Sequence, residues 1–356
     1  MNGLDPIISA FRYQRDGLTQ SSPLYYRLLD VAIEDVENAG ICAEVLAETP
    51  EGVEPVLDAL PLRFLGGVHG LVLDGHAPDL ARHYPSSGGR FDPDDPALDP
   101  GPVFLATVAE HRDRVVAALA RTVQTNEVGR CASLLPGFLA VAAATGLPLR
   151  VLELGTSAGL NLRWDQYRYE GGAGGSTWGD DNAALRFTDV YVDPLPELDV
   201  SAAVVERRGC DRSPIDTTSA DGRQLLRSFV WPDQLERFAA LDAALDIASS
   251  VPAAIDRADA AEWVVEQLGR TSDGCATVLF QSIVWQYLTP ETRESIRDAV
   301  RAAGTVASAE APLAWLRMEP GSNPTAGAEV RLRMWPGEER LLAITGYHGR
   351  PVRLCD

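Results

Sequence analysis

The chain has no lysine, few cysteines and no long apolar run, and each scarcity excludes a class of protein. All 31 basic residues are arginine, and 51 acidic residues leave a formal net charge of −20. Such a surface repels phosphate backbones and anionic lipids, so we expect neither a nucleic-acid partner nor a membrane partner. No stretch approaches the roughly 18 uncharged apolar residues of a membrane span.

The cysteines are dispersed and form no Cys-x-x-Cys pair: Cys42, Cys131, Cys210, Cys275 and Cys355. An odd, scattered set is typical of reduced thiols and argues against disulfides and a zinc site. The N-terminal residues lack a basic region followed by an apolar run, so we expect no signal peptide. Together these features predict a cytoplasmic protein without a bound metal.

The acidity has two explanations that the sequence leaves open. An acidic, lysine-free surface suits a salt-rich cytosol, where the Debye length falls to about 3 Å in 1 M salt and self-repulsion weakens. A genome that encodes arginine in place of lysine would produce the same composition.

The 356 residues are 46% hydrophobic, which indicates one large or two medium globular domains. Residues up to 146 look helical, with Ser22 and Pro23 as a helix start and apolar helical runs over 57–73, 103–119 and 132–144. From residue 147 the pattern changes. We predict a helical cap domain over residues 1–146 and an α/β domain over 147–356.

Strand-like apolar runs alternate with helices in the second half, which predicts a parallel sheet covered on both faces. The expected strands are 149–154, 202–206, 252–255, 276–280 and 313–318. The segments 329–335 and 339–345 flank Pro336-Gly337 and predict an antiparallel hairpin. The expected fold is a Rossmann-like, mostly parallel sheet with an antiparallel C-terminal hairpin.

The most informative stretch is the first of these strands and the turn Gly155-Thr156-Ser157-Ala158-Gly159 that follows it. A glycine turn at this point suits a nucleotide-like cofactor. Glu153 stands two residues before the turn, and its carboxylate would repel a pyrophosphate but suit an ammonium or hydroxyl group. S-adenosylmethionine carries an ammonium, a sulfonium and a ribose but no phosphate.

The same five residues also spell Gly-x-Ser-x-Gly, the nucleophile elbow of α/β-hydrolases. In that interpretation Ser157 is the nucleophile, and His348 is the only histidine downstream of it. A serine hydrolase is therefore an alternative function.

Acidic residues follow two further strands. Asp211 is placed to accept hydrogen bonds from ribose hydroxyls, although Asp211-Arg212-Ser213-Pro214 also favours a turn. Asp259 is placed to meet an adenine amino group, although an aspartate here could equally cap the next helix.

These signatures resemble those of class I S-adenosylmethionine-dependent methyltransferases over residues 147–352. The matching residues are Glu153, Gly155 and Gly159, then Gly209, Asp211, Ser213 and Pro214, then Asp259 and Ala260, then Tyr287, Leu288 and Pro290. Ser157 replaces the middle glycine, and the insertion before the second signature is long. The resemblance implies S-adenosylmethionine as cofactor, held by Glu153, Gly155, Ser157, Gly159, Asp211 and Asp259. It assigns no catalytic residue, so a cofactor-binding protein without catalysis stays an alternative.

A polar run precedes the last helix of the first half, with Asn126, Glu127 and Arg130. These residues either cap and fasten that helix or point toward the methyl acceptor. We expect the acceptor to be a small molecule of unknown identity, bound beside Trp285 and Tyr287 and covered by the helical cap, which would exclude water.

A further set of stretches lies in both halves of the chain: Phe11-Arg12-Tyr13-Gln14, Gln124-Thr125-Asn126-Glu127-Val128-Gly129-Arg130, Arg163-Trp164-Asp165-Gln166-Tyr167-Arg168-Tyr169, Glu206 to Pro214, Trp231-Pro232-Asp233-Gln234 and Ser282-Ile283-Val284-Trp285-Gln286-Tyr287. Through these stretches the whole chain resembles an uncharacterised family, domain of unknown function 2332. This resemblance implies no activity.

Overall fold

The computed structural model describes residues 4–18, 21–171, 175–192, 200–270, 272–321, 323 and 327–355. The chain forms two compact units, which we describe separately. The helical unit comprises Met1–Thr125 with Ser219–Ala239, and the sheet unit comprises Asn126–Thr218 with Ala240–Asp356. This division differs from the expected boundary at residue 146, because the helix before the first strand belongs to the sheet unit.

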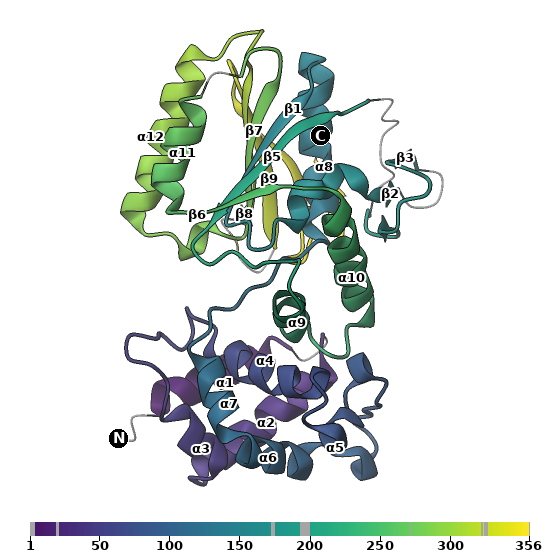
Figure 1. Ribbon diagram of the computed structural model, residues 1–356, viewed down its shortest axis with the longest axis vertical. Helices are drawn as coiled ribbons and strands as arrows, with labels where there is room; N and C mark the ends of the chain where they lie inside the picture. The colour runs from purple at the N-terminus through teal and green to yellow at the C-terminus, as the bar shows by residue number, and fades with distance from the viewer. Residues whose placement is uncertain are drawn as a thin grey trace. The chain divides into compact units, whose positions relative to one another are not determined.

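The described part of the helical unit contains helices and no strand, as the sequence predicts (Figure 1). Its helices are α1 (Asp5–Asp16), α2 (Pro23–Glu37), α3 (Ile41–Leu46), α4 (Leu60–Leu73), α5 (Pro78–Ala81), α6 (Gly101–Glu110), α7 (Arg112–Leu119) and α9 (Ala220–Ser228), with 3-10 turns η1 (Pro85–Ser87) and η2 (Pro96–Leu98). The single helix expected over 103–119 is wrong, because the chain breaks at His111, which lies between α6 and α7.

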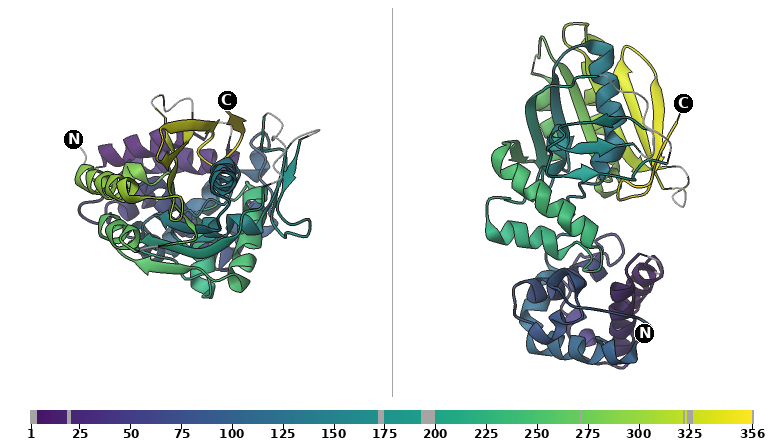
Figure 2. Two further views of the ribbon diagram at one scale, coloured as in Figure 1. Left: turned by 90° about the horizontal axis from the view of Figure 1, so that it is seen from above. Right: turned by 90° about the vertical axis from the view of Figure 1, so that its right-hand side faces the viewer.

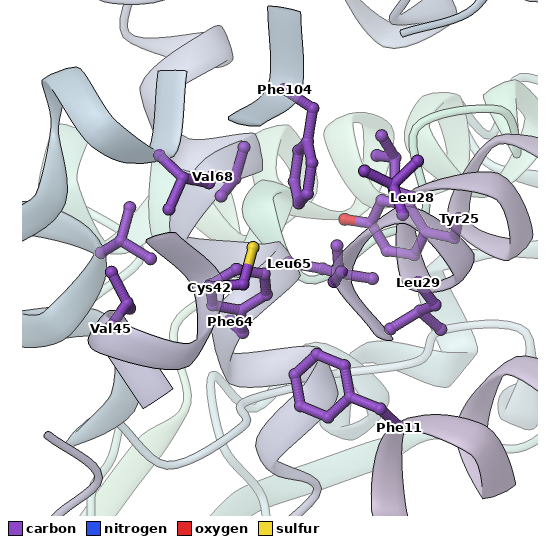
Figure 3. Packing of buried hydrophobic residues seen from close by; sticks show 14 of the residues in the cluster. Phe11, Tyr25, Leu28, Leu29, Cys42, Val45, Phe64, Leu65, Val68 and Phe104 are labelled. Atoms are coloured by element: carbon purple, nitrogen blue, oxygen red, sulfur yellow. The ribbon is translucent and has the colours of Figure 1, made fainter. Parts of the chain in front are cut away.

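Aromatic and aliphatic side chains from helices α1 to α7 form the core of this unit, and Figure 3 shows part of it. Phe64 of α4 lies at its centre, with ring centroids 5.7 Å from Phe11 and 6.1 Å from Phe104. All three rings are almost fully buried. Edge-on and tilted aromatic pairs of this kind contribute about 0.5–1.5 kcal/mol each beyond the burial of their area.

The segment Ser219–Ala239 belongs to this unit, and its side chains form hydrogen bonds with parts of the unit that are distant in sequence. Asp233 accepts hydrogen bonds from the Ser22 hydroxyl (2.7 Å) and the Leu24 backbone N–H (3.1 Å) at the start of α2. The Ser22 hydroxyl in turn caps α2, as predicted. The Trp-Pro-Asp-Gln stretch therefore fixes the N-terminus of α2.

The sheet unit contains an eight-stranded sheet in the order β11-β10-β9-β8-β7-β1-β5-β6 (Figure 1). The five strands of this sheet that come first in the chain run parallel, and each of the last three pairs antiparallel with its neighbours. The strands are β1 (Leu149–Leu154), β5 (Val204–Asp211), β6 (Ala254–Arg257), β7 (Ala276–Ser282), β8 (Leu313–Pro320), β9 (Ala328–Trp335), β10 (Glu339–Thr345) and β11 (Val352–Leu354). The mostly parallel α/β sheet and the closing hairpin are thus confirmed.

Helices cover both faces of this sheet, as its buried central strands require. α11 (Ala260–Leu268) and α12 (Pro290–Val306) lie on one face, and α8 (Arg130–Thr145) lies on the other (Figures 1 and 2). Leu152 and Leu154 of β1 pack toward α11 and α12. Gly137 lets α8 approach the sheet, because a Cβ there would clash with Leu316 of β8. α10 (Leu235–Ser250) contains the boundary between the two units.

The long insertion after β1 holds a small sheet that the sequence did not predict. It begins with the 3-10 helix η3 (Leu160–Gln166), and its strands are β2 (Arg168–Glu170), β3 (Thr177–Trp178) and β4 (Arg186–Phe187). Trp164 is stacked between Phe138 and Trp178, with ring centroids 4.3 and 5.3 Å away. Aromatic stacking therefore fastens this insertion to α8.

The chain starts this sheet at β1 and adds later strands first on one side of it and then on the other. The chain proceeds from β1 to β5 and β6 on one side, then returns to build β7 and β8 on the other side. In open α/β sheets, ligands bind beyond the carboxyl ends of the strands at such a switch point. The candidate ligand site is therefore formed by the loops that follow β1, β5 and β7.

Within the described ranges, no helix has the length and apolarity needed to cross a membrane. The same part of the chain holds no cluster of three or more His, Cys, Asp or Glu side chains suited to a metal ion.

Candidate functional site

The turn after β1 is held in an unusual backbone conformation. Gly155, Ser157 and Gly159 have φ values of +65°, +51° and +71°. Serine rarely adopts a positive φ, and such strain persists where the surroundings over-determine it. The turn thus presents closely spaced backbone groups at the carboxyl edge of the sheet.

Both glycines are also required by the protein's own packing. A Cβ on Gly155 would clash with the Val284 side chain, and one on Gly159 would lie 2.7 Å from Cδ1 of Ile255. The expectation that these glycines make room for a ligand therefore has a competing explanation, since neighbouring side chains already occupy that space.

Asp211 lies at the end of β5, directly beside this turn. Its Oδ2 accepts a hydrogen bond from the Ser157 backbone N–H at 2.9 Å, and its Oδ1 accepts one from the Ser213 backbone N–H at 2.8 Å. The second bond closes the turn that Asp211-Arg212-Ser213-Pro214 predicts. Each carboxylate oxygen keeps acceptor capacity, so Asp211 can both fix the turn and bind hydroxyl groups.

Glu153 lies beneath the turn rather than in front of it. It is 2% exposed, and its Oε2 accepts a hydrogen bond from the Thr156 hydroxyl at 2.5 Å. Burial raises the pKa of Glu153 to about 8, against the opposing effect of hydrogen bonds from Thr156 and Asn161. At neutral pH this group is mostly protonated, so it differs from the open carboxylate expected from the sequence.

The segment 126–130 bridges three loops at the same edge. Asn126 Oδ1 accepts a hydrogen bond from the Leu160 backbone N–H at 2.8 Å, in the turn after β1. Arg130 donates to the carbonyl of Ser282 at 3.0 Å, at the end of β7, and to that of Tyr347 at 3.1 Å. These residues belong to the sheet unit and lie at the switch point.

Glu127 faces the loop that follows β10. Because β10 runs in the same direction as β7, its carboxyl end lies at the same sheet edge. Oε2 of the buried Glu127 lies 3.4 Å from Nδ1 of His348, and Oε1 accepts a hydrogen bond from the Gly129 backbone N–H. A carboxylate beside an imidazole is an arrangement that can hold or move a proton.

The loop after β7 carries strain of its own. Ile283 has a φ of +53°, which is a true outlier for a β-branched residue. Glu319, at the end of β8, accepts hydrogen bonds from the backbone N–H groups of Val284 (3.3 Å) and Trp285 (3.2 Å) and from the Gln281 side chain (2.9 Å). Burial raises the pKa of Glu319, while these bonds oppose the shift. Glu319 thus holds the 283–285 loop in place.

The two aromatic residues expected near the acceptor differ in their surroundings. Trp285, in the 3-10 turn η4 (Trp285–Tyr287), packs edge-on against Trp315 with ring centroids 5.8 Å apart. Tyr287 is 61% exposed. Of the two, Trp285 is therefore the one held by the protein.

Asp259 serves as the N-cap of α11. Its Oδ1 accepts a hydrogen bond from the Ala261 backbone N–H at 2.9 Å, and its Oδ2 lies 3.2 Å from the Arg212 guanidinium. The capping alternative raised for this residue is therefore observed, and its carboxylate is already used by the protein.

Ser157 does not have the surroundings of a hydrolase nucleophile. Its hydroxyl is buried, and the described residues offer it no hydrogen-bond partner, whereas a nucleophilic serine needs a base within reach. The ring of His348 meets Glu127 instead.

A serine–histidine contact does exist in the helical unit. The Ser86 hydroxyl lies 2.9 Å from Nε2 of His69, and Nδ1 of His69 lies 3.2 Å from the Ser228 carbonyl. Burial lowers the pKa of His69 to about 3. Since general bases work best with a pKa near the operating pH, His69 is too weak a base for this role.

A comparison with models of protein families assigns the chain to one family. The family model described as "Uncharacterized protein conserved in bacteria (DUF2332)" matches residues 9–353. The protein belongs to this family. No curated protein matches the DUF2332 chain, and no solved structure does. The resemblance to this family that the sequence suggests is thus confirmed.

The sequence of this DUF2332 protein indicates no role in the site for Ile283, Val284 or Glu319, and it suggests His348 only as part of a hydrolase. A charged residue at the end of an apolar strand was the available signal for Glu319. Nothing in the local sequence of Ile283 indicates a positive φ, and its backbone N–H donates to the carbonyl of Met318 in β8, which is distant in sequence.

Proposed function

We propose that the sheet unit binds S-adenosylmethionine and transfers its methyl group to a small molecule. One observation carries this proposal: the strained turn after β1 is hydrogen-bonded to Asp211 at the end of β5, at the switch point of a doubly wound sheet. In doubly wound folds, a nucleotide cofactor is held by the turn after the first strand together with an acidic residue at the end of the second.

The residues fit the nucleoside half of this cofactor. Asp211 keeps acceptor capacity for ribose hydroxyls, and the buried Ser157 hydroxyl, which lacks a partner among the described residues, would donate to a ligand. The methionine end would meet no open carboxylate at Glu153, because this side chain is buried and mostly protonated at neutral pH.

When bound, S-adenosylmethionine supplies an electrophilic methyl group. The protein's own contribution would be to position the acceptor and exclude water, and to take up a proton if the acceptor loses one. Asn126 and Arg130 would position the acceptor, since they connect the loops around the switch point. Glu127 and His348 would hold the proton.

Titration with S-adenosylhomocysteine tests the proposal. At 100 times its dissociation constant, a ligand stabilises the fold by about 2.7 kcal/mol. The Asp211→Ala substitution should abolish this gain. Asp211→Asn keeps one acceptor oxygen, and therefore at most one of the two turn hydrogen bonds, so it should retain only part of the gain. Asp216→Ala is the matched control, because Asp216 also closes a local turn, to Thr218.

The absence of binding heat with S-adenosylmethionine and S-adenosylhomocysteine, in both dilute and molar salt, would refute the proposal. Binding of NAD in their place would point to a redox cofactor. Cofactor binding without turnover across a panel of small acceptors would favour the non-catalytic alternative.

A further inference from the structure

A groove lined by arginines runs along α12 on the outer surface of the sheet unit. Arg293, Arg297 and Arg301 follow one another at four-residue intervals, so they share one face of the helix over about 12 Å. The groove has a volume of about 370 Å³, and its lining includes a single carboxylate, from Glu294. This is a concentration of positive charge on a chain whose net charge is −20.

Two of the three guanidinium groups are held in place by neutral groups. Arg293 donates to the backbone carbonyls of Trp285 (2.8 Å) and Gln286 (3.2 Å). Arg297 lies over the Trp285 ring, with its guanidinium carbon 5.1 Å from the ring centroid. Carbonyls and an aromatic ring orient these cations without neutralising them.

The third arginine is only weakly neutralised. Arg301 lies 3.3 Å from Asp298, but both side chains are 67% exposed, and exposed pairs of this kind contribute little. For Arg297, the described residues provide no carboxylate partner. The groove therefore keeps most of its positive charge.

This arrangement is unfavourable for the helix itself. Like charges four residues apart repel each other, and a cation near a helix N-terminus opposes the helix dipole. Arg293 lies in the first turns of α12, which begins at Pro290. An anion bound in the groove would relieve both penalties.

We propose that this groove binds a small oxyanion, carried by a phosphorylated or polycarboxylate metabolite. A guanidinium group matches the geometry of phosphate and carboxylate oxygens with two parallel hydrogen bonds. A volume of about 370 Å³ suits a small ligand. The net charge of −20 repels extended polyanions at a distance, which favours a small anion over a nucleic acid. The proposal does not depend on methyl transfer.

Calorimetric titration of the full chain at low ionic strength tests the groove, with pyrophosphate and citrate as separate probes. Arg297→Gln should weaken binding by about tenfold or more, and Arg297→Lys should lie between, because lysine keeps the charge but loses the planar fork. Arg114→Gln, on the exposed face of α7, makes the same charge change elsewhere and should leave affinity within about twofold. Melting temperatures of the variants check that the fold is intact.

Binding of pyrophosphate alone identifies phosphate groups as the part of the ligand that is recognised, and equal binding of citrate extends this to carboxylates. Either result supports the groove only if Arg297→Gln removes it. No binding of either probe up to about 10 mM would overturn the proposal. So would equal affinities of the wild type and Arg297→Gln, or preferential Arg297-dependent binding of a single-stranded oligonucleotide.

Discussion

Glu153 gives the sharpest test of the site, because its burial predicts how strongly the free energy of unfolding depends on pH. Its pKa is raised from 4.5 to about 8 by burial. A raised pKa means that the folded state binds the proton more tightly than the unfolded state does. The associated stability is therefore complete below pH 4.5 and is lost as the pH rises through 8.

The magnitude follows from the shift. A difference of 8 − 4.5 = 3.5 units, at about 1.36 kcal/mol per unit, gives an upper limit of about 5 kcal/mol lost above pH 8. The Glu153→Gln variant cannot ionise but keeps an oxygen that accepts the Thr156 hydroxyl. We therefore expect the variant to exceed the wild type in stability by several kcal/mol at pH 9 and by less than about 1 kcal/mol at pH 5.

Urea unfolding of both proteins between pH 5 and pH 9 measures this difference. Glu262→Gln, in the exposed first turn of α11, is the control for the loss of one negative charge. A difference between Glu153→Gln and the wild type that does not change with pH would refute the reasoning. It would mean that Glu153 is ionised in the folded protein, as an open carboxylate facing a cationic ligand would be.

Two further predictions concern the hydrolase alternative and the acidic surface. A fluorophosphonate probe should label neither Ser157, which lacks a base, nor Ser86, whose partner His69 is too weakly basic. Stoichiometric labelling that the Ser157→Ala substitution removes would establish the hydrolase instead. The melting temperature should rise from dilute buffer to molar KCl by more than that of a near-neutral control protein, because salt screens the repulsion among −20 net charges; a flat response would favour genome composition as the reason for the missing lysine.

The sequence predicts the sheet better than the domain boundary. Every strand expected between residues 149 and 345 is present, although β5 and β6 begin two residues later than expected. β1 and β7 are the clearest cases, because they are buried throughout and their sequences are largely apolar. The segment Ser219–Ala239 could not be assigned to the helical unit in advance. Asp233 anchors it there by accepting hydrogen bonds from Ser22 and Leu24, and local patterns carry no information about partners more than 200 residues away.

In the candidate site as well, the sequence predicts which residues lie at the sheet edge but not the direction in which their side chains point. Position along the strands predicts that Asp211 and the glycine turn meet, because the carboxyl ends of adjacent parallel strands share one edge. Whether a side chain at that edge faces outward or inward depends on its neighbours. Asp259 turns to cap α11, and Glu153 turns beneath the loop to reach Thr156.

The strained residues explain why the two loops at the switch point must be considered together. Val284 occupies the space that a Cβ on Gly155 would need, and it is brought there by a loop in which Ile283 has a positive φ. The backbone N–H groups of that loop donate hydrogen bonds to the Met318 carbonyl and the Glu319 carboxylate of β8, which hold it in place. Backbone strain of about 1–3 kcal/mol persists only where surrounding contacts impose it. The shape of the turn after β1 is thus determined by a strand that comes more than 150 residues later, which no pattern around Gly155 could reveal.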